Sequence, residues 1–541
     1  MEKINGTIFR SMLESACNNL NAHKKEVDAL NVFPVPDGDT GTNMSLTFTN
    51  GISEIRKSGS SDLKVVAKTL SRGLLMGARG NSGVILSQIF RGIYQYIGDR
   101  DELTVQEFSD ALLNGSKLAY KAVMRPTEGT ILTVIRESSE AGATYMTEHP
   151  DASMEEFMPV VLKEAKASEE RTPDLLPVLK EAHCTDSGGA GLVYVFEGFE
   201  AYLEGKPFTE ESAEEEKEQK ETKNEHASGY RTEFILTFDD KHAKSFNEDR
   251  FRKSCEQLGN KITLLVSEEG VKLRINTMTP GEVLMLAERY GNFDAVQIEP
   301  IQGDLKPSII TEEEEKKEKP VEAKEYGIIA VAAGDGLKKL FTDYRTDYVV
   351  SGGQTMNPST EDISNAIRKV NAKHVFVLPN NSNIIMAANQ AAEVTEDKDV
   401  IVLPTKSVLQ GLSACINFNP DEDVDTNKEA MQEAVDHVKS GSVTYAIKDT
   451  TVDGREIHQG DYMGILDKDI VITSDNKVDT AKQLISKMMD DDSEIVTLLK
   501  GQDGTDEETK EIEDYINDNW DVDVDVQDGG QPVYSFFIGV E

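Results

Sequence analysis

Apolar residues in the first part of the chain recur at the spacing of an α-helix. Isoleucines follow one another at four-residue steps from Ile85 to Ile97, and residues 61–78 and 154–168 show the same periodicity. Side chains three or four residues apart lie on one face of a helix, so each stretch can bury one side against its neighbours. The pattern predicts about eight helices and no strand, that is, an all-helical bundle over residues 1–208.

The second block, residues 230–310, has mixed periodicity. Its expected elements are a strand, a helix, a hairpin, a helix and a strand, over residues 231–238, 247–259, 261–276, 280–291 and 294–300. This is the element order of a ferredoxin-like unit. The pattern predicts a small α+β domain, and no cluster of catalytic residue types is evident in it.

The last block, residues 326–541, contains short apolar runs without polar alternation, which is typical of parallel strands buried on both faces. The runs are residues 326–333, 347–353, 374–380 and 399–405, and each leads through a loop into a helical pattern. They predict an α/β domain, followed by antiparallel strands at residues 443–449 and 534–541. Loops at the carboxyl edge of such a sheet can bind ligands, although ordinary connecting loops are the simpler interpretation.

Two segments between these blocks, residues 209–229 and 311–325, are highly charged and almost without apolar residues, so they predict flexible linkers. The formal net charge of -41 argues against a nucleic-acid partner, because phosphate backbones need Lys and Arg. The four cysteines are far apart and form no CxxC pair. Neither a signal peptide nor a membrane span is evident, and we expect a soluble, cytoplasmic protein.

The stretch NVFPVPDGDTGTNM, residues 31–44, is the most informative motif. Asp37 and Asp39 are separated by one glycine, and paired carboxylates in a loop suit Mg²⁺, with Asn31 as a further oxygen donor. The residues that follow, 40–43, would open a helix whose free N–H groups favour an anion. DGD alone favours an ordinary turn. The cation and anion features together predict a Mg–nucleotide site.

Three more Gly-rich or Asp-rich loops lie between the predicted helices, at residues 77–83, 125–130 and 185–191. Each can be read as a phosphate cradle or as a capped helix start. The chain contains neither a Walker A sequence nor a kinase-type Gly-rich loop after a strand. A nucleotide would therefore bind at helix ends.

The motifs PDGDTGTNM, ARGNSGVIL, EGTIL and TDSGGAGL resemble the ATP-binding L-subunit of dihydroxyacetone kinases. The three-block layout, with a DegV-like last domain carrying SGGQTMNPS, resembles the bacterial fatty acid kinase catalytic subunit over essentially the whole chain. The resemblance implies an eight-helix barrel that binds Mg–ATP at one end. Its metal-binding and catalytic aspartates fall on Asp37 and Asp39, with Asn31 near the place of a third. Its nucleotide contacts fall on Thr40, Gly41, Thr42, Asn43, Asn81, Ser82, Thr130, Asp186, Ser187 and Gly188.

The resemblance also implies the reaction, in which a fatty acid held by a separate fatty-acid-binding carrier protein is phosphorylated on its carboxylate. Such a carboxylate is already ionised at neutral pH and needs no general base. The product is an acyl phosphate, used in phospholipid metabolism, and a homodimer is a possible assembly. Two alternatives remain open: a dihydroxyacetone-type kinase acting on a small hydroxyl compound, and a non-catalytic lipid-binding scaffold.

Some fatty acid kinase subunits hold zinc in the middle domain through a Cys and an HxH pair. Arg231, Arg274 and Asn276 stand at the matching positions here. Because none of these side chains is a usual zinc ligand, we expect ATP and Mg²⁺ as cofactors and no zinc.

Overall fold

The computed structural model describes all residues except 32–37, 210–229, 239–245, 247–250, 253, 256–257, 268–269, 278, 301–322, 354–355, 447–448, 453–454 and 468. The chain divides into two compact units. One unit combines residues 1–219 with 323–541, and the other contains residues 220–322. The predicted linkers lie outside the described residues apart from their edges, and the strand β7 begins at Lys324, inside the second of them.

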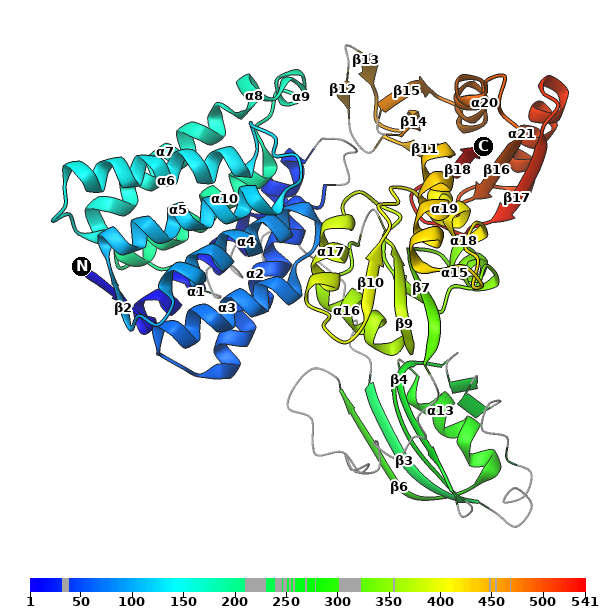
Figure 1. The fold of residues 1–541 in the computed structure, drawn as a ribbon, viewed down its shortest axis with the longest axis horizontal. Helices are drawn as coiled ribbons and strands as arrows, with labels where there is room; N and C mark the ends of the chain where they lie inside the picture. The colour runs from blue at the N-terminus through cyan, green and yellow to red at the C-terminus, as the bar shows by residue number, and fades with distance from the viewer. Residues whose placement is uncertain are drawn as a thin grey trace. The chain divides into compact units, whose positions relative to one another are not determined.

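The N-terminal region is helical, as predicted, with long helices packed side by side around one apolar core (Figure 1). The long helices are α1 (Gly6–Leu30), α2 (Thr40–Ser58), α3 (Leu63–Gly77), α4 (Gly80–Ile97), α5 (Val105–Ala122), α6 (Ile131–Glu148), α7 (Met154–Glu170) and α10 (Ser187–Leu203). Two short helices, α8 (Thr172–Leu175) and α9 (Pro177–Glu181), precede α10. A carbon added at Gly198 would lie 2.3 Å from the Ala16 Cα, so the backbones of α1 and α10 touch at this point. None of the described helices is long and apolar enough to cross a membrane.

The prediction of no strand in this region is wrong. β1 (Lys3–Asn5) pairs antiparallel with β2 (Glu102–Thr104), and this pair ties the N-terminus to the start of α5. Each strand has only three residues, which is too short for a two-residue alternation to show in the sequence.

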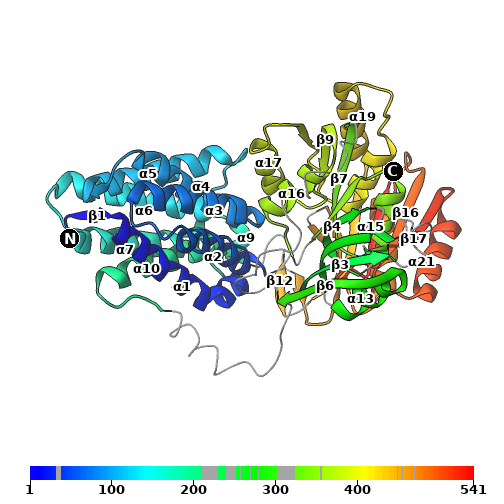
Figure 2. The same cartoon turned by 90° about the horizontal axis from the view of Figure 1, so that it is seen from below.

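The C-terminal region begins with the predicted parallel sheet, in the order β10-β9-β7-β8. Its strands are β7 (Lys324–Ala332), β8 (Tyr348–Ser351), β9 (Ala372–Leu378) and β10 (Asp399–Val402). α16 (Thr360–Lys369) and α17 (Ile385–Glu393) cover one face (Figure 2). α15 (Asp335–Asp343), α18 (Val408–Ile416) and α19 (Val424–His437) cover the other. Burial on both faces explains the uninterrupted apolar runs.

A second, mixed sheet completes this region, in the order β15-β14-β11-β18-β16-β17. Its strands are β11 (Lys439–Tyr445), β14 (Tyr462–Leu466), β15 (Asp469–Ser474), β16 (Ile495–Lys500), β17 (Asp523–Asp528) and β18 (Phe536–Val540). β11 and β18 pair antiparallel, which confirms the prediction for the end of the chain. α20 (Lys477–Met488) and α21 (Asp506–Asn519) pack on this sheet.

The middle unit is an antiparallel sheet in the order β4-β5-β3-β6. Its strands are β3 (Tyr230–Phe238), β4 (Asn260–Val266), β5 (Gly270–Thr277) and β6 (Gly291–Pro300), with α13 (Pro280–Ala287) before β6. A sheet is present in this unit, as predicted, and the ferredoxin-like assignment stays a prediction. The predicted helix over residues 247–259 falls largely outside the described residues.

Arg231 and Arg274 of the middle unit, two of the three positions compared with zinc ligands in the sequence, take part in ion pairs. The Glu233 side chain is fully buried, and its Oε1 lies 3.2 Å from Arg231 Nε and 3.0 Å from Arg274 Nε. Arg231 also reaches Glu299, at 3.0 Å. Charged hydrogen bonds therefore link β3, β5 and β6 at this point.

Candidate functional site

The four predicted loops all lead directly into helix N-termini. α2 begins at Thr40 after Asp39, α4 at Gly80 after Arg79, α6 at Ile131 after Thr130, and α10 at Ser187 after Asp186. Each N-terminus carries backbone N–H groups without a partner in the helix and a partial positive charge. Such ends attract phosphate groups.

Close contacts bring these four helix starts to the same end of the helical region. The start of α4 lies close to α2, because a carbon added at Gly80 would come within 2.6 Å of Asn43 Nδ2. The φ angle of Gly80 is +58°, which also favours glycine. A carbon added at Gly191 would lie 2.6 Å from Met44 Sδ, which joins α10 to α2. The Asp186 carboxylate accepts hydrogen bonds from the backbone of Ile131 and of Gly189, which joins α10 to α6.

Asp39 is the carboxylate at the centre of this arrangement. It is only 9% exposed, and among the described residues no ion pair reaches it. Burial, with the nearby Asp28 carboxylate as a smaller contribution, raises its pKa to about 6, although hydrogen bonds from Asn43 and Asn357 oppose the shift. A buried carboxylate without a cationic partner is a suitable ligand for a metal ion.

Asp28 belongs to this end of the region, and the sequence reasoning missed it. Its Oδ1 and Oδ2 accept hydrogen bonds from Thr42 N and Thr42 Oγ1, both at 2.8 Å. A carboxylate in the last turn of a helix is electrostatically unfavourable, and Asp28 lies there in α1. That unfavourable position was the signal in the sequence that Asp28 has a partner elsewhere.

The remaining predicted residues are placed as follows. Asn31 donates from Nδ2 to Thr40 Oγ1 at 2.8 Å, so it lies beside the start of α2. Asn81 donates to Asn383 Oδ1 at 3.1 Å, and Ser82 follows it in the first turn of α4. Gly41, Ser187 and Gly188 lie in the first turns of α2 and α10. Asp37 lies outside the described residues.

The oxygen donors present here fit Mg²⁺. Asp39, with Asp28 close by, supplies carboxylate oxygens and no nitrogen or sulfur, the donor chemistry that Mg²⁺ prefers. No group of three or more metal-ligating side chains occurs among the residues that the structure describes. A Mg²⁺ ion usually takes one or two carboxylates and completes its shell with water and phosphate oxygens.

Metal binding is expected to weaken in acid. Mg²⁺ on Asp39 would compete with protons for that carboxylate, whose pKa of about 6 means that it is half protonated at pH 6 and fully ionised only well above it. Below that pH, affinity should fall by up to about tenfold per unit for one competing proton. Calorimetric titration of Mg²⁺ with AMP-PNP at pH 7.5 and at pH 5, corrected for protonation of the nucleotide, measures this fall. An Asp39→Asn variant should bind Mg²⁺ weakly at both pH values. If its Mg²⁺ affinity fell between pH 7.5 and pH 5 as much as that of the unmodified chain, the assignment of Asp39 as a metal ligand would be contradicted.

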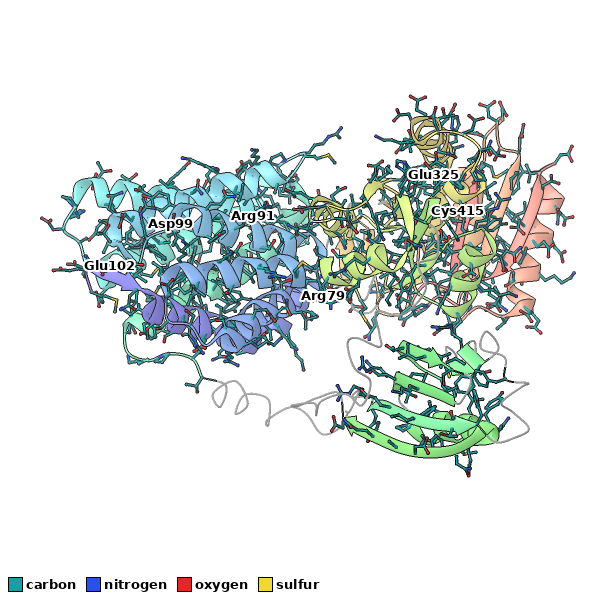
Figure 3. All side chains as sticks on the ribbon, turned by 60° about the horizontal axis from the view of Figure 1, so that its bottom comes forward. Arg79, Arg91, Asp99, Glu102, Glu325 and Cys415 are labelled. Atoms are coloured by element: carbon teal, nitrogen blue, oxygen red, sulfur yellow. The ribbon has the colours of Figure 1, made fainter. Side chains whose placement is uncertain are left out.

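The C-terminal region contributes side chains to the same end. Asn357 donates from Nδ2 to Asp39 Oδ2 at 2.5 Å, and Arg79 donates from a guanidinium nitrogen to the Asn357 carbonyl at 2.7 Å. Arg79 also lies 3.4 Å from the Asp362 carboxylate at the start of α16. Figure 3 labels Arg79, which directly precedes α4, and Arg91, which lies within α4. Sequence reasoning included Arg79 in a predicted loop without giving it a role, and it did not group Asn357, Asp362 or Arg91 with the site.

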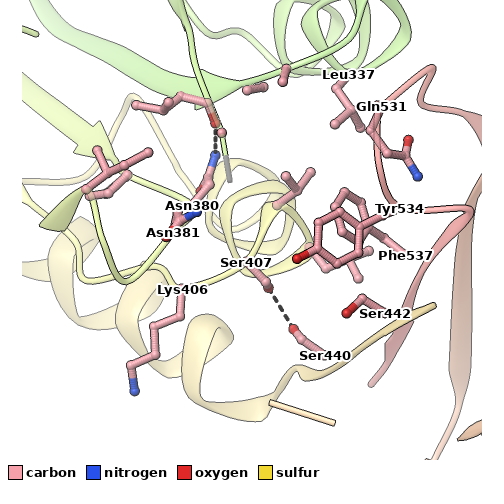
Figure 4. A pocket seen from close by; sticks show the side chains of 18 of the residues that line it. Leu337, Asn380, Asn381, Lys406, Ser407, Ser440, Ser442, Gln531, Tyr534 and Phe537 are labelled. Carbon is pink, nitrogen blue, oxygen red and sulfur yellow. Dashed lines mark hydrogen bonds between the residues drawn. The ribbon is translucent and has the colours of Figure 1, made fainter. Parts of the chain in front are cut away.

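A separate cavity of about 100 Å³ lies in the C-terminal region, between its two sheets (Figure 4). The loops after β7, β8 and β9 line it, as expected for the carboxyl edge of a parallel sheet. Ser407 and Ser440 hydrogen bond across one side at 2.7 Å, and Tyr534 and Phe537 form part of an apolar wall. The volume is well below the ~300–1,000 Å³ of ordinary ligand pockets.

Comparisons with known families identify a helical domain of kinase type followed by sheet-containing domains. Residues 34–201 match the DAK2 domain. Residues 227–306 match the middle domain of the FakA-like fatty acid kinase proteins, and residues 327–541 match their C-terminal domain. The chain belongs to this FakA-like fatty acid kinase family.

Relatives match along the whole chain. Protein YloV of Bacillus subtilis is 43% identical over 553 residues, covering 99% of both chains. An uncharacterized protein of Staphylococcus aureus strain MRSA252 is 40% identical over 553 residues, covering 100% of both.

Solved structures resemble parts of the chain. Dihydroxyacetone kinase of C. freundii is 18% identical to this chain, and the match covers 37% of this chain and 35% of that chain with a TM-score of 0.29. A second structure of that kinase is in complex with AMP-PNP and Mg²⁺. A fatty-acid-binding DegV family protein from Thermus thermophilus is 11% identical over 40% of this chain and 99% of that chain, with a TM-score of 0.31.

Proposed function

We propose that this chain is an ATP- and Mg²⁺-dependent kinase that phosphorylates the carboxylate of a fatty acid presented by a separate carrier protein. The observation that carries the proposal is that four helix N-termini lie at one end of the helical region, the end that also holds the buried carboxylate of Asp39. Membership of the FakA-like fatty acid kinase family supports the choice of acceptor.

The chain's residues would act mainly by positioning. Asp39 and Asp37 would hold Mg²⁺, which when bound neutralises charge on the phosphate oxygens. The helix N-termini at Thr40, Gly80 and Ser187 would hold the triphosphate through backbone N–H groups. One oxygen of the fatty acid carboxylate attacks the γ-phosphorus, the bond from that phosphorus to the β,γ-bridging oxygen breaks, and ADP leaves. No proton moves, because the acceptor is already ionised.

A separate carrier is consistent with the size of the C-terminal cavity. The cavity of about 100 Å³ is smaller than ordinary ligand pockets, which gives no support to a long acyl chain bound there. The scaffold alternative, in which this region itself holds a lipid, is therefore less well supported. The dihydroxyacetone-type alternative would require a proton acceptor for the substrate hydroxyl, and a nearby Asp could serve.

The test is detection of an acyl phosphate. Purified full-length protein is incubated with ATP, Mg²⁺ and a candidate carrier loaded with oleate, such as a fatty-acid-binding DegV family protein. Hydroxylamine converts an acyl phosphate into a hydroxamate that mass spectrometry identifies. We expect oleoyl hydroxamate only when ATP, Mg²⁺ and loaded carrier are all present.

Two controls separate the alternatives. Replacing the loaded carrier by dihydroxyacetone tests the small-hydroxyl kinase, and phosphorylated dihydroxyacetone without hydroxamate would contradict the proposal. Binding of oleate by this chain, with no ATP consumption under any condition, would indicate the scaffold instead.

A further inference from the structure

Two side-chain amides hold the Asp39 carboxylate, and one of them comes from the far end of the chain. Asn43, one turn into α2, provides the first. Asn357, separated from Asp39 by 318 positions, provides the second and is only 2% exposed. Its Oδ1 is also buried and, within the described part of the chain, has no hydrogen-bond partner.

The backbone around Asn357 is fixed against the helical region. The Asn357 carbonyl accepts from Arg79, and Thr360 N donates to the Ala78 carbonyl at 3.1 Å. Ser359 caps α16 through a reciprocal pair of hydrogen bonds with Asp362, which fixes the direction in which the loop enters the helix. The place of the amide beside Asp39 is therefore set by several independent contacts.

Apolar packing supports the same placement. Ala78, which ends α3, and Val84 of α4 belong to one buried cluster with Ile363 and Ile367 of α16. Asn357 therefore lies at the edge of a shared apolar core and is shielded from water, and a hydrogen bond in such a place is stronger than at an exposed surface.

We propose that Asn357 is a positioning residue of the metal–nucleotide site, so that the C-terminal region completes a site built mainly by the helical region. Its hydrogen bond to Asp39 Oδ2 fixes the orientation of the carboxylate that would hold the cation. Hydrogen-bond partners of metal-ligating carboxylates orient them, and their loss typically weakens metal affinity about 10- to 100-fold. The unpartnered Asn357 Oδ1 adds an acceptor for water at the same place. The inference rests on the proposed function, because it assigns Mg²⁺ to Asp39.

The test is Asn357→Ala in the full-length chain. Alanine removes the side-chain amide and keeps the backbone carbonyl that accepts from Arg79. Mn²⁺ is the probe, and its free concentration is read from its electron paramagnetic resonance signal in the presence of AMP-PNP, after correction for the Mn²⁺–nucleotide complex in solution. We expect the Kd for Mn²⁺ to rise about 10- to 100-fold.

Glu393→Gln is the matched control. It removes the ion pair between Arg91 and Glu393, at 3.7 Å, which also joins the C-terminal region to α4 but does not touch Asp39. We expect its Kd for Mn²⁺ to stay within about twofold of the unmodified chain, since an exposed pair contributes little.

Each other outcome has a defined meaning. The positioning role would be overturned if Asn357→Ala left the Kd for Mn²⁺ unchanged, or if Glu393→Gln weakened Mn²⁺ binding as much as Asn357→Ala does. Tighter Mn²⁺ binding in Asn357→Ala would also overturn it, because it would show that the amide competes with the metal. If the unmodified chain binds Mn²⁺ and AMP-PNP but forms no acyl phosphate, the proposed acceptor is wrong and the role of Asn357 stands.

Discussion

Asp39→Ala should reduce phosphoryl transfer by about 10³-fold or more, the effect of removing a principal charge-stabilising group from an active site. Unfolding temperature should stay the same or rise. The Asp39 side chain does not cap its own helix, and burial of its charge raises its pKa to about 6, so the ionised form is unfavourable in the folded chain. Hydroxamate formation measures the transfer, and differential scanning fluorimetry measures the stability.

Asp99→Ala is the control for this substitution. Asp99 is an exposed carboxylate of the same region that pairs with Lys64, and its removal should leave transfer unchanged. Near-normal transfer in Asp39→Ala would refute the metal assignment. The same loss is expected for Asp37→Ala, on the sequence motif alone.

Glu233→Ala should destabilise the middle unit by about 3–5 kcal/mol, because it breaks a buried ion pair by removing one partner. The Glu233 carboxylate is fully buried and contacts both Arg231 and Arg274. Without it, Arg274 loses the partner at 3.0 Å and the guanidinium stays partly buried. Hydrogen exchange of the β3 and β5 amides, followed by mass spectrometry, reads this unit separately from the rest of the chain.

The control for that measurement is Glu288→Ala, which removes an exposed carboxylate from the same unit. We expect its exchange rates to stay close to those of the unmodified chain, since exposed substitutions usually change stability by less than about 0.5 kcal/mol. If the β3 and β5 amides of Glu233→Ala exchanged as slowly as those of Glu288→Ala, the ion pairs of Glu233 would contribute little to the stability of the middle unit.

Local patterns in the sequence predicted the helix starts and the strands well. The loop at residues 185–191 had two readings, a phosphate cradle or a capped helix start, and in the structure the Asp186 carboxylate caps α10 by accepting from Gly189 at 2.7 Å. The apolar runs of β7 and β9 indicated parallel strands, and the register from Ile328 to Phe376 is parallel. These features depend on neighbours in sequence, so composition and spacing suffice to find them.

The parts of the site that depend on distant neighbours could not be predicted in this way. Asp28 of α1 is paired with Thr42 of α2, and helical periodicity gives no pairing between different helices. Asn357 reads as part of an ordinary loop, because its role depends on how α16 packs on α4. The short β1–β2 pair is likewise formed by tertiary contact between segments too short to carry a pattern.

The separation between Asp39 and Asn357 also has a consequence during protein synthesis. Ribosomes add roughly 5–20 residues per second, so the 318 positions between these residues take on the order of 16–64 s to make. The helical region, which folds from contacts within its own sequence, emerges long before its C-terminal partner. A nascent or prematurely terminated chain therefore exposes Asp39 and the apolar surface around Ala78 and Val84 until that partner arrives.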